Sequence, residues 1–230
     1  MLFFMLRGAG VSLSVFFLTL LFSLPLALTV ALGRMSRSIP LRAVVSFYLL
    51  IMRGTPLILQ LIFIYFAPKY LLAFLRSNIT NISNQTFWSA LESLLSYNRF
   101  TAVIIAFSLN YAAYFAEIYR GGLESIPRGQ REAAKVLGFT KYQAFFRILL
   151  PQVIKRILPA SGNEFITLVK DTALAQVIGV AELFHAAQNA SAREFSTTPI
   201  FAAGLFYLVM NWAVTVSFAQ FEKKLSYYKS

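Results

Sequence analysis

The sequence predicts an all-α membrane protein, and three observations support this fold class. Of the 230 residues, 58% are hydrophobic and only 13% are charged. An ordinary soluble domain carries about 25% charged residues, and the mean hydropathy of +0.65 exceeds what one soluble core can bury. The apolar residues also fall in runs that approach or exceed the roughly 20 residues a helix needs to cross a bilayer. We expect a single transmembrane domain over residues 1–230.

Five transmembrane spans are expected along the chain. The first has no charge between Arg7 and Arg34. It is longer than a signal-peptide core and ends without an A-x-A-like cleavage site, so a retained helix is favoured. The second contains glycine and proline together, which predicts a kink or break. The predicted spans cover residues 9–33, 43–75 (broken near 53–56), 100–119, 165–186 and 198–221.

The distribution of Lys and Arg predicts which side of the membrane each connecting segment faces. One set of alternate segments holds 14 basic residues and the other holds five. The richer set is 34–42, 120–164 and 222–230, and the poorer set is 1–7, 67–99 and 187–197. By the positive-inside rule the N-terminus is outside and the C-terminus is cytoplasmic. The same rule accounts for the net charge of +12, so this charge does not indicate a nucleic-acid partner. The polar segment 76–97 is then an outer loop or a short amphipathic helix.

The third predicted span carries a polar stripe. Asn110, Tyr114 and Glu117 lie at i, i+4 and i+7, so they share one helix face. Because a lipid-facing carboxylate is costly, this face is expected to meet protein or a water-filled cavity. It is either one wall of a solute path or a hydrogen-bonded seam between helices.

Charged residues in two other spans have open roles. Arg53 either lines a translocation path or its inner gate, or reaches out to lipid phosphate. Lys170 and Asp171 are adjacent and point about 100° apart on a helix, so each is expected to pair with a group on another span or subunit. Lys170 could instead reach the interface, and Asp171 and Thr172 could meet the polar parts of a zwitterionic solute.

A short basic segment in the cytoplasmic loop 120–164 has the pattern of two helices joined by a glycine. Good helix formers precede Gly138, which supplies the left-handed residue that commonly closes a helix. Thr140 and Gln143 have the spacing of a capping box, which predicts a second helix start. A boundary is predicted at Pro151, because the residue before a proline is pushed out of the helical region.

This segment resembles the cytoplasmic loop motif of ABC-importer permeases. The motif is Glu-Ala-Ala, three residues, Gly, nine residues, Ile, any residue and Leu-Pro, and every spacing is kept. The matching residues are Glu132, Ala133, Ala134, Gly138, Ile148, Leu150 and Pro151. The resemblance implies the five-helix type I permease fold, in which this loop forms a coupling helix that docks on an ATPase subunit. The alternative is an ordinary amphipathic connector on the membrane surface.

Two further matches indicate the polar amino-acid branch of this family. They are Arg53-Gly-Thr-Pro56 and the segment 168–174, followed by 180–183. The resemblance implies an ATP-driven importer of polar amino acids in the bacterial cytoplasmic (inner) membrane. Its other members would be a second permease copy or paralogue, an ATPase and an extracytoplasmic amino-acid-binding protein. The candidate pathway residues are Arg53, Thr55, Asn110, Tyr114, Glu117, Lys170, Asp171 and Thr172.

No catalytic or metal chemistry is expected of this chain. It has no Gly-Lys pair and hence no phosphate-binding loop of the usual type, so ATP and Mg are expected on the partner ATPase. There is no cysteine and His185 is the lone histidine, so no metal site is expected. Two other functions stay open. One is an ion- or proton-coupled carrier or channel subunit that uses Glu117, Lys170 and Asp171; the other is a structural membrane subunit whose basic loop binds anionic lipid.

Overall fold

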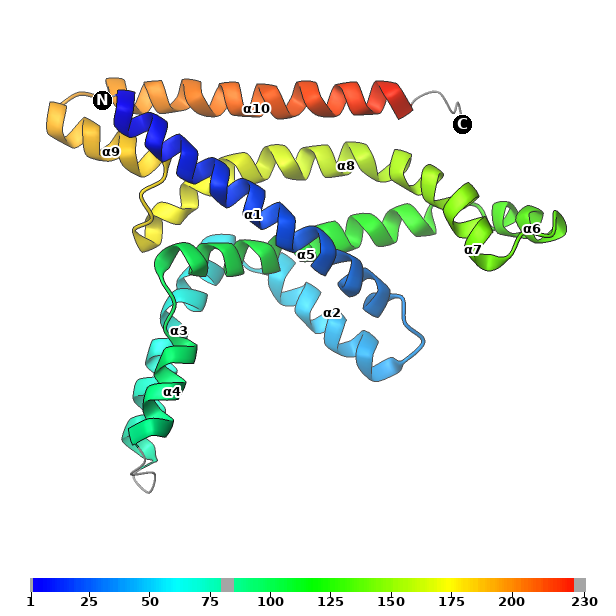
Figure 1. Ribbon diagram of the computed structural model, residues 1–230, viewed down its shortest axis with the longest axis horizontal. Helices are drawn as coiled ribbons and strands as arrows, with labels where there is room; N and C mark the ends of the chain where they lie inside the picture. The colour runs from blue at the N-terminus through cyan, green and yellow to red at the C-terminus, as the bar shows by residue number, and fades with distance from the viewer. Residues whose placement is uncertain (1, 80–84, 226–230) are drawn as a thin grey trace.

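The computed structural model describes residues 2–79 and 85–225, and every regular element among them is a helix (Figure 1). The all-α prediction is therefore confirmed over these residues. Four long helices run along the length of the molecule, and α8 lies between α5 and α10 in this view. These helices are α1 (Leu2–Arg34), α5 (Arg99–Glu124), α8 (Leu150–Asp171) and α10 (Thr198–Leu225).

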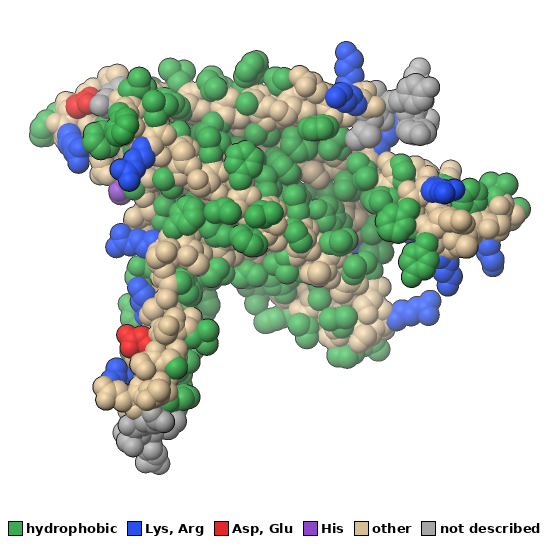
Figure 2. Space-filling view, viewed as in Figure 1, with side chains coloured by type: hydrophobic (Ala, Val, Ile, Leu, Met, Phe, Trp, Pro, Cys, Tyr) green, Lys and Arg blue, Asp and Glu red, His purple; other side chains and the backbone are tan. Residues whose placement is uncertain are grey.

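Among the described residues, four helices are long and apolar enough to cross a membrane. They are α1, α3 (Leu57–Asn78), α5 and α10. Figure 2 shows the same property on the surface, where hydrophobic side chains cover a broad middle region and Lys and Arg gather towards its two ends. α8 has 22 residues, as α3 does, but it carries five charged residues and is less apolar.

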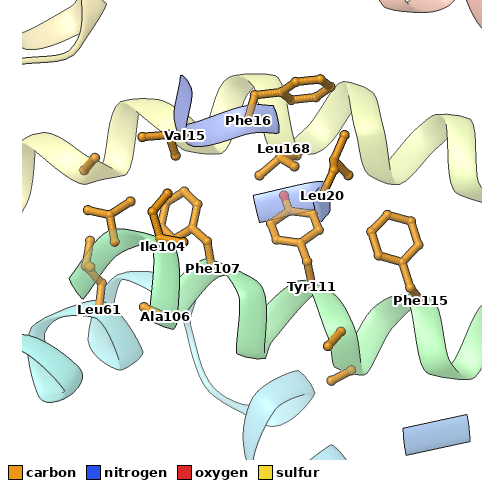
Figure 3. Packing of buried hydrophobic residues seen from close by; sticks show 14 of the residues in the cluster. Val15, Phe16, Leu20, Leu61, Ile104, Ala106, Phe107, Tyr111, Phe115 and Leu168 are labelled. Atoms are coloured by element: carbon orange, nitrogen blue, oxygen red, sulfur yellow. The ribbon is translucent and has the colours of Figure 1, made fainter. Parts of the chain in front are cut away.

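The core forms where α1 packs against α5. Small buried side chains on both helices let the two backbones approach closely. Larger side chains of α5 fill the remaining space, and Figure 3 shows Phe107, Tyr111 and Phe115 projecting toward α1 and α8. The small residues of this contact are Ala27, Ala31, Ala112, Ala113 and Ala116.

The second predicted span is broken, as its Gly-Thr-Pro sequence predicts. α2 (Ile39–Gly54) ends before Thr55 and Pro56, whose backbone is extended, and α3 then begins. α4 (Gln85–Leu95) lies in the polar segment 76–97, where either a loop or a short amphipathic helix is expected, and residues 80–84 lie outside the described part of the chain.

The fourth predicted span, 165–186, is not one helix, and this prediction was wrong. α8 ends at Asp171, a 3₁₀ helix η2 (Thr172–Ile178) follows, and Gly179 is left-handed at φ +79°. The Glu182 side chain then caps α9 (Leu183–Glu194). Apolar composition alone does not reveal the break, because the residues of η2 are as apolar as those of a membrane helix.

The helical boundary predicted at Pro151 was also wrong. α7 (Lys141–Ala144), a π-helical turn η1 (Phe145–Leu149) and α8 form one continuous helix. A proline has no N–H to donate, and its ring crowds the preceding turn. The wider turn, in which the Leu150 N–H donates to the Phe145 carbonyl, makes room for it, so the helix continues.

Candidate functional site

The predicted helix–glycine–helix segment is present at one end of the molecule. α6 (Arg128–Val136) is followed by Gly138 in the left-handed conformation, at φ +77°. The capping box is complete: the Gln143 N–H donates to Thr140 Oγ1 at 3.3 Å, and the Thr140 N–H donates to Gln143 Oε1 at 3.0 Å. The local geometry inferred for this segment is therefore confirmed.

This segment is anchored to the rest of the chain by a small apolar cluster. Ile126, Leu149 and Val153 are buried together between the end of α5, η1 and the start of α8. The Arg156 guanidinium also donates to the Ser125 carbonyl and so ties α8 to the end of α5. These contacts fix η1 and the start of α8 against the end of α5, and α6 packs on α7 and η1.

The seven motif residues do not form one surface. Ala134 is buried, and Ile148 and Leu150 are half-buried, so these side chains pack within the segment. Glu132, Ala133 and Pro151 are exposed. The motif therefore supplies both the internal packing and part of the outer face.

Large apolar side chains that the motif does not include are exposed beside it. Val136 is 87% exposed, Leu137 72% and Tyr142 80%, and Phe146 projects from the following turn. Five basic residues share the stretch, so it is poorly suited to the bilayer interior and has the composition of a protein-binding surface. These basic residues are Arg128, Arg131, Lys135, Lys141 and Arg147.

A polar junction joins the broken second span to α5. The Gln60 side-chain amide donates to the carbonyls of Met52 and Thr55, both at 3.0 Å. The Asn110 amide donates to the Met52 carbonyl and to Gln60 Oε1, both at 2.9 Å. Asn110 is 4% exposed, so its contacts match the hydrogen-bonded seam rather than an open wall. Gln60 is absent from the sequence-based candidates, although it follows the break by one helical turn.

The other two stripe residues meet Arg53. Glu117 lies 3.6 Å from the Arg53 guanidinium and 2.8 Å from that of Arg120, which in turn lies 2.5 Å from Glu124. The Arg53 guanidinium also lies over the Tyr114 ring, 5.6 Å from its centroid. Arg53 therefore pairs with a neighbouring helix in this structure. The spacing of Glu117, Arg120 and Glu124 on one face was the signal that could have revealed the larger cluster.

Asp171 has its partner on another helix, as predicted. The Tyr111 hydroxyl donates to Asp171 Oδ2 at 2.7 Å, and Thr172, which is 1% exposed, donates to the Val169 carbonyl at 2.7 Å. Lys170 is exposed and lies apart from these contacts. Glu164 was missed; it precedes Asp171 by seven residues on the same helix face and lies within electrostatic range of it.

A second missed carboxylate, Glu182, holds three helices together. It is fully buried and accepts hydrogen bonds from the N–H groups of Phe184 and His185, both at 2.7 Å. The Tyr207 hydroxyl of α10 donates to it at 2.9 Å, and the Ser12 hydroxyl of α1 at 3.4 Å. An acidic residue directly before a helix is a cap signal, so its role here is structural.

Comparison with known proteins identifies the family. Residues 23–227 match the family described as "Binding-protein-dependent transport system inner membrane component". The chain belongs to this family. It is a multi-pass permease of the bacterial cytoplasmic membrane, and the loop motif and the polar junction lie within the matched residues.

Individual relatives are similar over almost their whole length. An arginine transport system permease protein of Bacillus subtilis is 34% identical over 223 residues, which cover 96% of this chain and 92% of the relative. An L-cystine transport system permease protein of the same organism is 36% identical, over 92% of this chain and 82% of the relative.

Solved structures agree with the family. The crystal structure of an amino acid ABC transporter with histidines has a TM-score of 0.78 and 32% identity, and the match covers 96% of this chain and 94% of that one. A methionine ABC transporter in inward-facing conformations has a TM-score of 0.70 at 19% identity, covering 98% and 97%. This second likeness concerns the fold alone.

Proposed function

We propose that this inner-membrane component is the permease subunit of an ATP-driven importer of polar amino acids. The observation that carries the proposal is the rigid, exposed segment from Arg128 to Phe146, which keeps the coupling motif and presents apolar side chains outside the apolar spans. The permease relatives that transport arginine and cystine support the amino-acid substrate class.

The coupling segment would transmit the nucleotide cycle of a separate ATPase, which holds ATP and Mg. Glu132, Val136, Leu137 and Tyr142 would contact the ATPase, because they are exposed and lie on either side of the glycine turn. The left-handed Gly138 and the capping box fix the angle between α6 and α7. A fixed angle matters because a flexible connection between α6 and α7 would absorb the movement of the ATPase instead of transmitting it to α5 and α8.

Two permease copies, identical or paralogous, would enclose the path, and an extracytoplasmic binding protein would deliver the solute. The Arg53–Glu117–Arg120 cluster lies at the end of α5 that leads to the coupling segment, which fits an inner gate. The Tyr111–Asp171 pair lies nearer the start of α5, further from the coupling segment. There, with Thr172 and Glu164, it would meet the polar groups of the solute. Thr55 and Asn110 would shape the path by holding the α2–α3 break in place.

The proposal also includes five spans with the N-terminus outside. Four of them are α1, α3, α5 and α10, and the remaining one is α8. Its first residues lie beside the coupling segment, whereas the α9 that follows it packs against the beginning of α1. A Cβ added at Gly8 would lie 2.9 Å from the Leu183 Cα, which shows how close that packing is. Because α1 is long enough to span, this arrangement supports a crossing by α8.

Uptake by the reconstituted complex tests the proposal. Proteoliposomes containing the permease, its ATPase and a solute-binding protein are supplied with a panel of radiolabelled amino acids, with and without ATP. We expect uptake of one or more polar amino acids only with ATP. Uptake that proceeds equally without ATP would instead favour an ion- or proton-coupled carrier.

The variant Leu137→Ala/Tyr142→Ala tests the coupling surface in the same assay. Both side chains are exposed, so the permease should insert and fold normally, while copurification with the ATPase falls. Phe201→Ala is the matched control, because Phe201 is equally exposed, at 75%, but lies on the apolar helix α10. Normal copurification of the double variant would remove this surface from the interface.

A further inference from the structure

Two adjoining grooves lie at the end of α5 remote from the coupling segment. The first, of about 640 Å³, lies between α1, α3, the start of α5 and the loop after η2. The second, of about 460 Å³, lies between the beginning of α1 and α9. Val11 and Ala181 line both grooves, so the two adjoin, and together we call them the double groove.

The double groove collects almost all the basic residues of its side of the protein. The segments predicted to face outward hold only five Lys and Arg residues. Four of them line the double groove: Lys69 and Arg99 in the first part, and Arg7 and Arg193 in the second. The positive-inside rule depletes cations on this side, so their concentration at one place calls for a local cause.

The two cations of the first groove are held in position, Lys69 by an aromatic side chain and Arg99 by a backbone carbonyl. Lys69 Nζ lies 4.4 Å from the centre of the Tyr65 ring and 3.4 Å from its hydroxyl, and Arg99 lines the same groove and donates to the Gly179 carbonyl at 3.4 Å. The Tyr97 hydroxyl donates to the Ile64 carbonyl, which fixes its ring at the groove wall. Each of the two cations is therefore held at the groove wall by a contact of its own.

Little negative charge compensates these cations. The three ion pairs found among the described residues all involve Glu117 or Arg120, at the other end of α5. Glu194 is the one acidic residue among the described residues that line the double groove. Fixed, uncompensated cations beside tyrosines favour a partner that brings carboxylates, since Tyr and Arg often dominate binding energy at interfaces.

We infer that the double groove is the docking surface for an acidic face of the solute-binding protein on which this family depends. This inference rests on the proposed function and on the outward orientation of this end. The family match supplies the class of partner, and the charge of the groove supplies the chemistry that the partner must present. Carboxylates of the binding protein would pair with Lys69 and Arg99 in the first groove. Carboxylates at the edge of the same acidic face would pair with Arg7 and Arg193 in the second.

Docking at this surface would reach the solute path through η2. The Arg99 guanidinium donates to the Gly179 carbonyl at 3.4 Å, and Val180 and Ala181 line the groove. The seven residues of η2, which rise about 2 Å each, lead from there to Asp171. A partner that pulls on Arg99 thus acts on the loop directly linked to the candidate solute-contacting residues.

Docking affinity of charge-reversed complexes tests the inference. The permease–ATPase complex is placed in lipid discs, and binding of the same solute-binding protein that is used in the uptake assay is measured by biolayer interferometry. We expect Lys69→Glu/Arg99→Glu to weaken binding roughly tenfold or more at about 0.05 M salt, and much less at about 0.5 M, because screening removes surface electrostatics. Lys69→Gln/Arg99→Gln, a milder change, should weaken binding in the same direction.

Arg76→Glu is the matched control. Arg76 lies in the last turn of α3 on the same side, but it lines neither groove, so reversing its charge should leave the affinity unchanged within about twofold. Unaltered affinity of the double variants, or an equal loss in Arg76→Glu, would overturn the inference. The inference would also be overturned if wild type and the double variants bound with equal affinity in discs of purely zwitterionic lipid, because the groove would then bind lipid headgroups.

Failure of docking and failure of the proposed function give different results. The double variants should still copurify with the ATPase as wild type does, since the coupling segment is untouched. If the wild-type complex docks the binding protein through the double groove but shows no ATP-dependent uptake, the inference stands and the proposed function fails. Replacing acidic residues of the binding protein by lysine should restore docking to the double variants.

Discussion

At the residue scale, two amides make the broken second span compatible with a membrane. The break between α2 and α3 frees backbone carbonyls, which have no water to bond in a bilayer core. Gln60 and Asn110 supply the missing donors to Met52 and Thr55, and they bond to each other. The polar residues at this junction are therefore needed for the helical arrangement itself, before any role in transport.

Replacing Asn110 by leucine should destabilise the permease by about 1 kcal/mol, the typical scale of a hydrogen bond between membrane helices. The Met52 carbonyl loses one donor and Gln60 Oε1 loses its donor, while the side-chain volume is nearly kept. Thermal unfolding of the purified protein in detergent measures the effect. Ser108→Ala is the control, because its buried hydroxyl has no hydrogen-bond partner among the residues that the structure describes. Equal melting temperatures for Asn110→Leu and wild type would contradict the seam.

Replacing Glu117 by glutamine should impair transport more than stability. Glu117 is the shared partner of Arg53 and Arg120, and hydrogen bonds to charged groups contribute about 1.5–3 kcal/mol. Uptake per assembled complex should therefore fall roughly ten- to hundredfold if this cluster is the inner gate. Glu124→Gln, which alters the most exposed member of the cluster, should retain most activity. Full uptake by Glu117→Gln would assign the cluster a purely structural role.

At the element scale, signals that act over a few residues predicted the structure well. Gly54 and Pro56 predicted the break before α3, and Thr140 with Gln143 predicted the start of α7. The ends of α8 were missed for a common reason. A π-helical turn accommodates Pro151, and Glu182 caps a new helix after an apolar 3₁₀ segment, so neither boundary follows from proline or hydropathy alone.

The candidate site was predictable as a set of residues but not as a set of contacts. The shared face of Tyr114 and Glu117 follows from helical spacing. Their contact with Arg53, which precedes Glu117 by more than 60 residues, depends on how α2 packs against α5. Gln60 and Glu182 are absent from the candidate pathway residues because their importance comes from backbone groups that only the fold leaves unpaired.

The glycine of the coupling segment is the element whose alteration should separate insertion from transport. Gly138→Pro cannot keep φ at +77°, since proline fixes φ near −65°, and it also removes the N–H that donates to the Lys135 carbonyl. Membrane insertion should persist while ATP-dependent uptake is lost, and the same outcome is expected for Glu132→Lys. Gly129→Ala is the control, because a Cβ there meets open space and the backbone is ordinary. Normal uptake by Gly138→Pro at equal expression would remove the coupling role.

At the scale of the whole molecule, α5 links the two regions proposed to meet partners. It has 26 residues and is about 39 Å long, more than the roughly 30 Å of hydrocarbon in a bilayer. Arg99 at its first turn faces the double groove, and Glu117 to Glu124 at its last turns carry the charge cluster next to the coupling segment. One rigid helix thus joins the proposed docking surface to the proposed ATPase contact.

The orientation of the molecule can be tested directly because the chain contains no cysteine. Single cysteines are introduced at Ser77, Lys141 and Gln188, which are exposed on α3, α7 and α9. With five spans, a membrane-impermeant maleimide should label Ser77→Cys and Gln188→Cys in intact cells, and Lys141→Cys only after the membrane is opened. If α8 does not cross, Gln188→Cys will instead share the protection of Lys141→Cys. Labelling of Lys141→Cys in intact cells would reverse the orientation and place the coupling segment beyond the reach of any cytoplasmic ATPase.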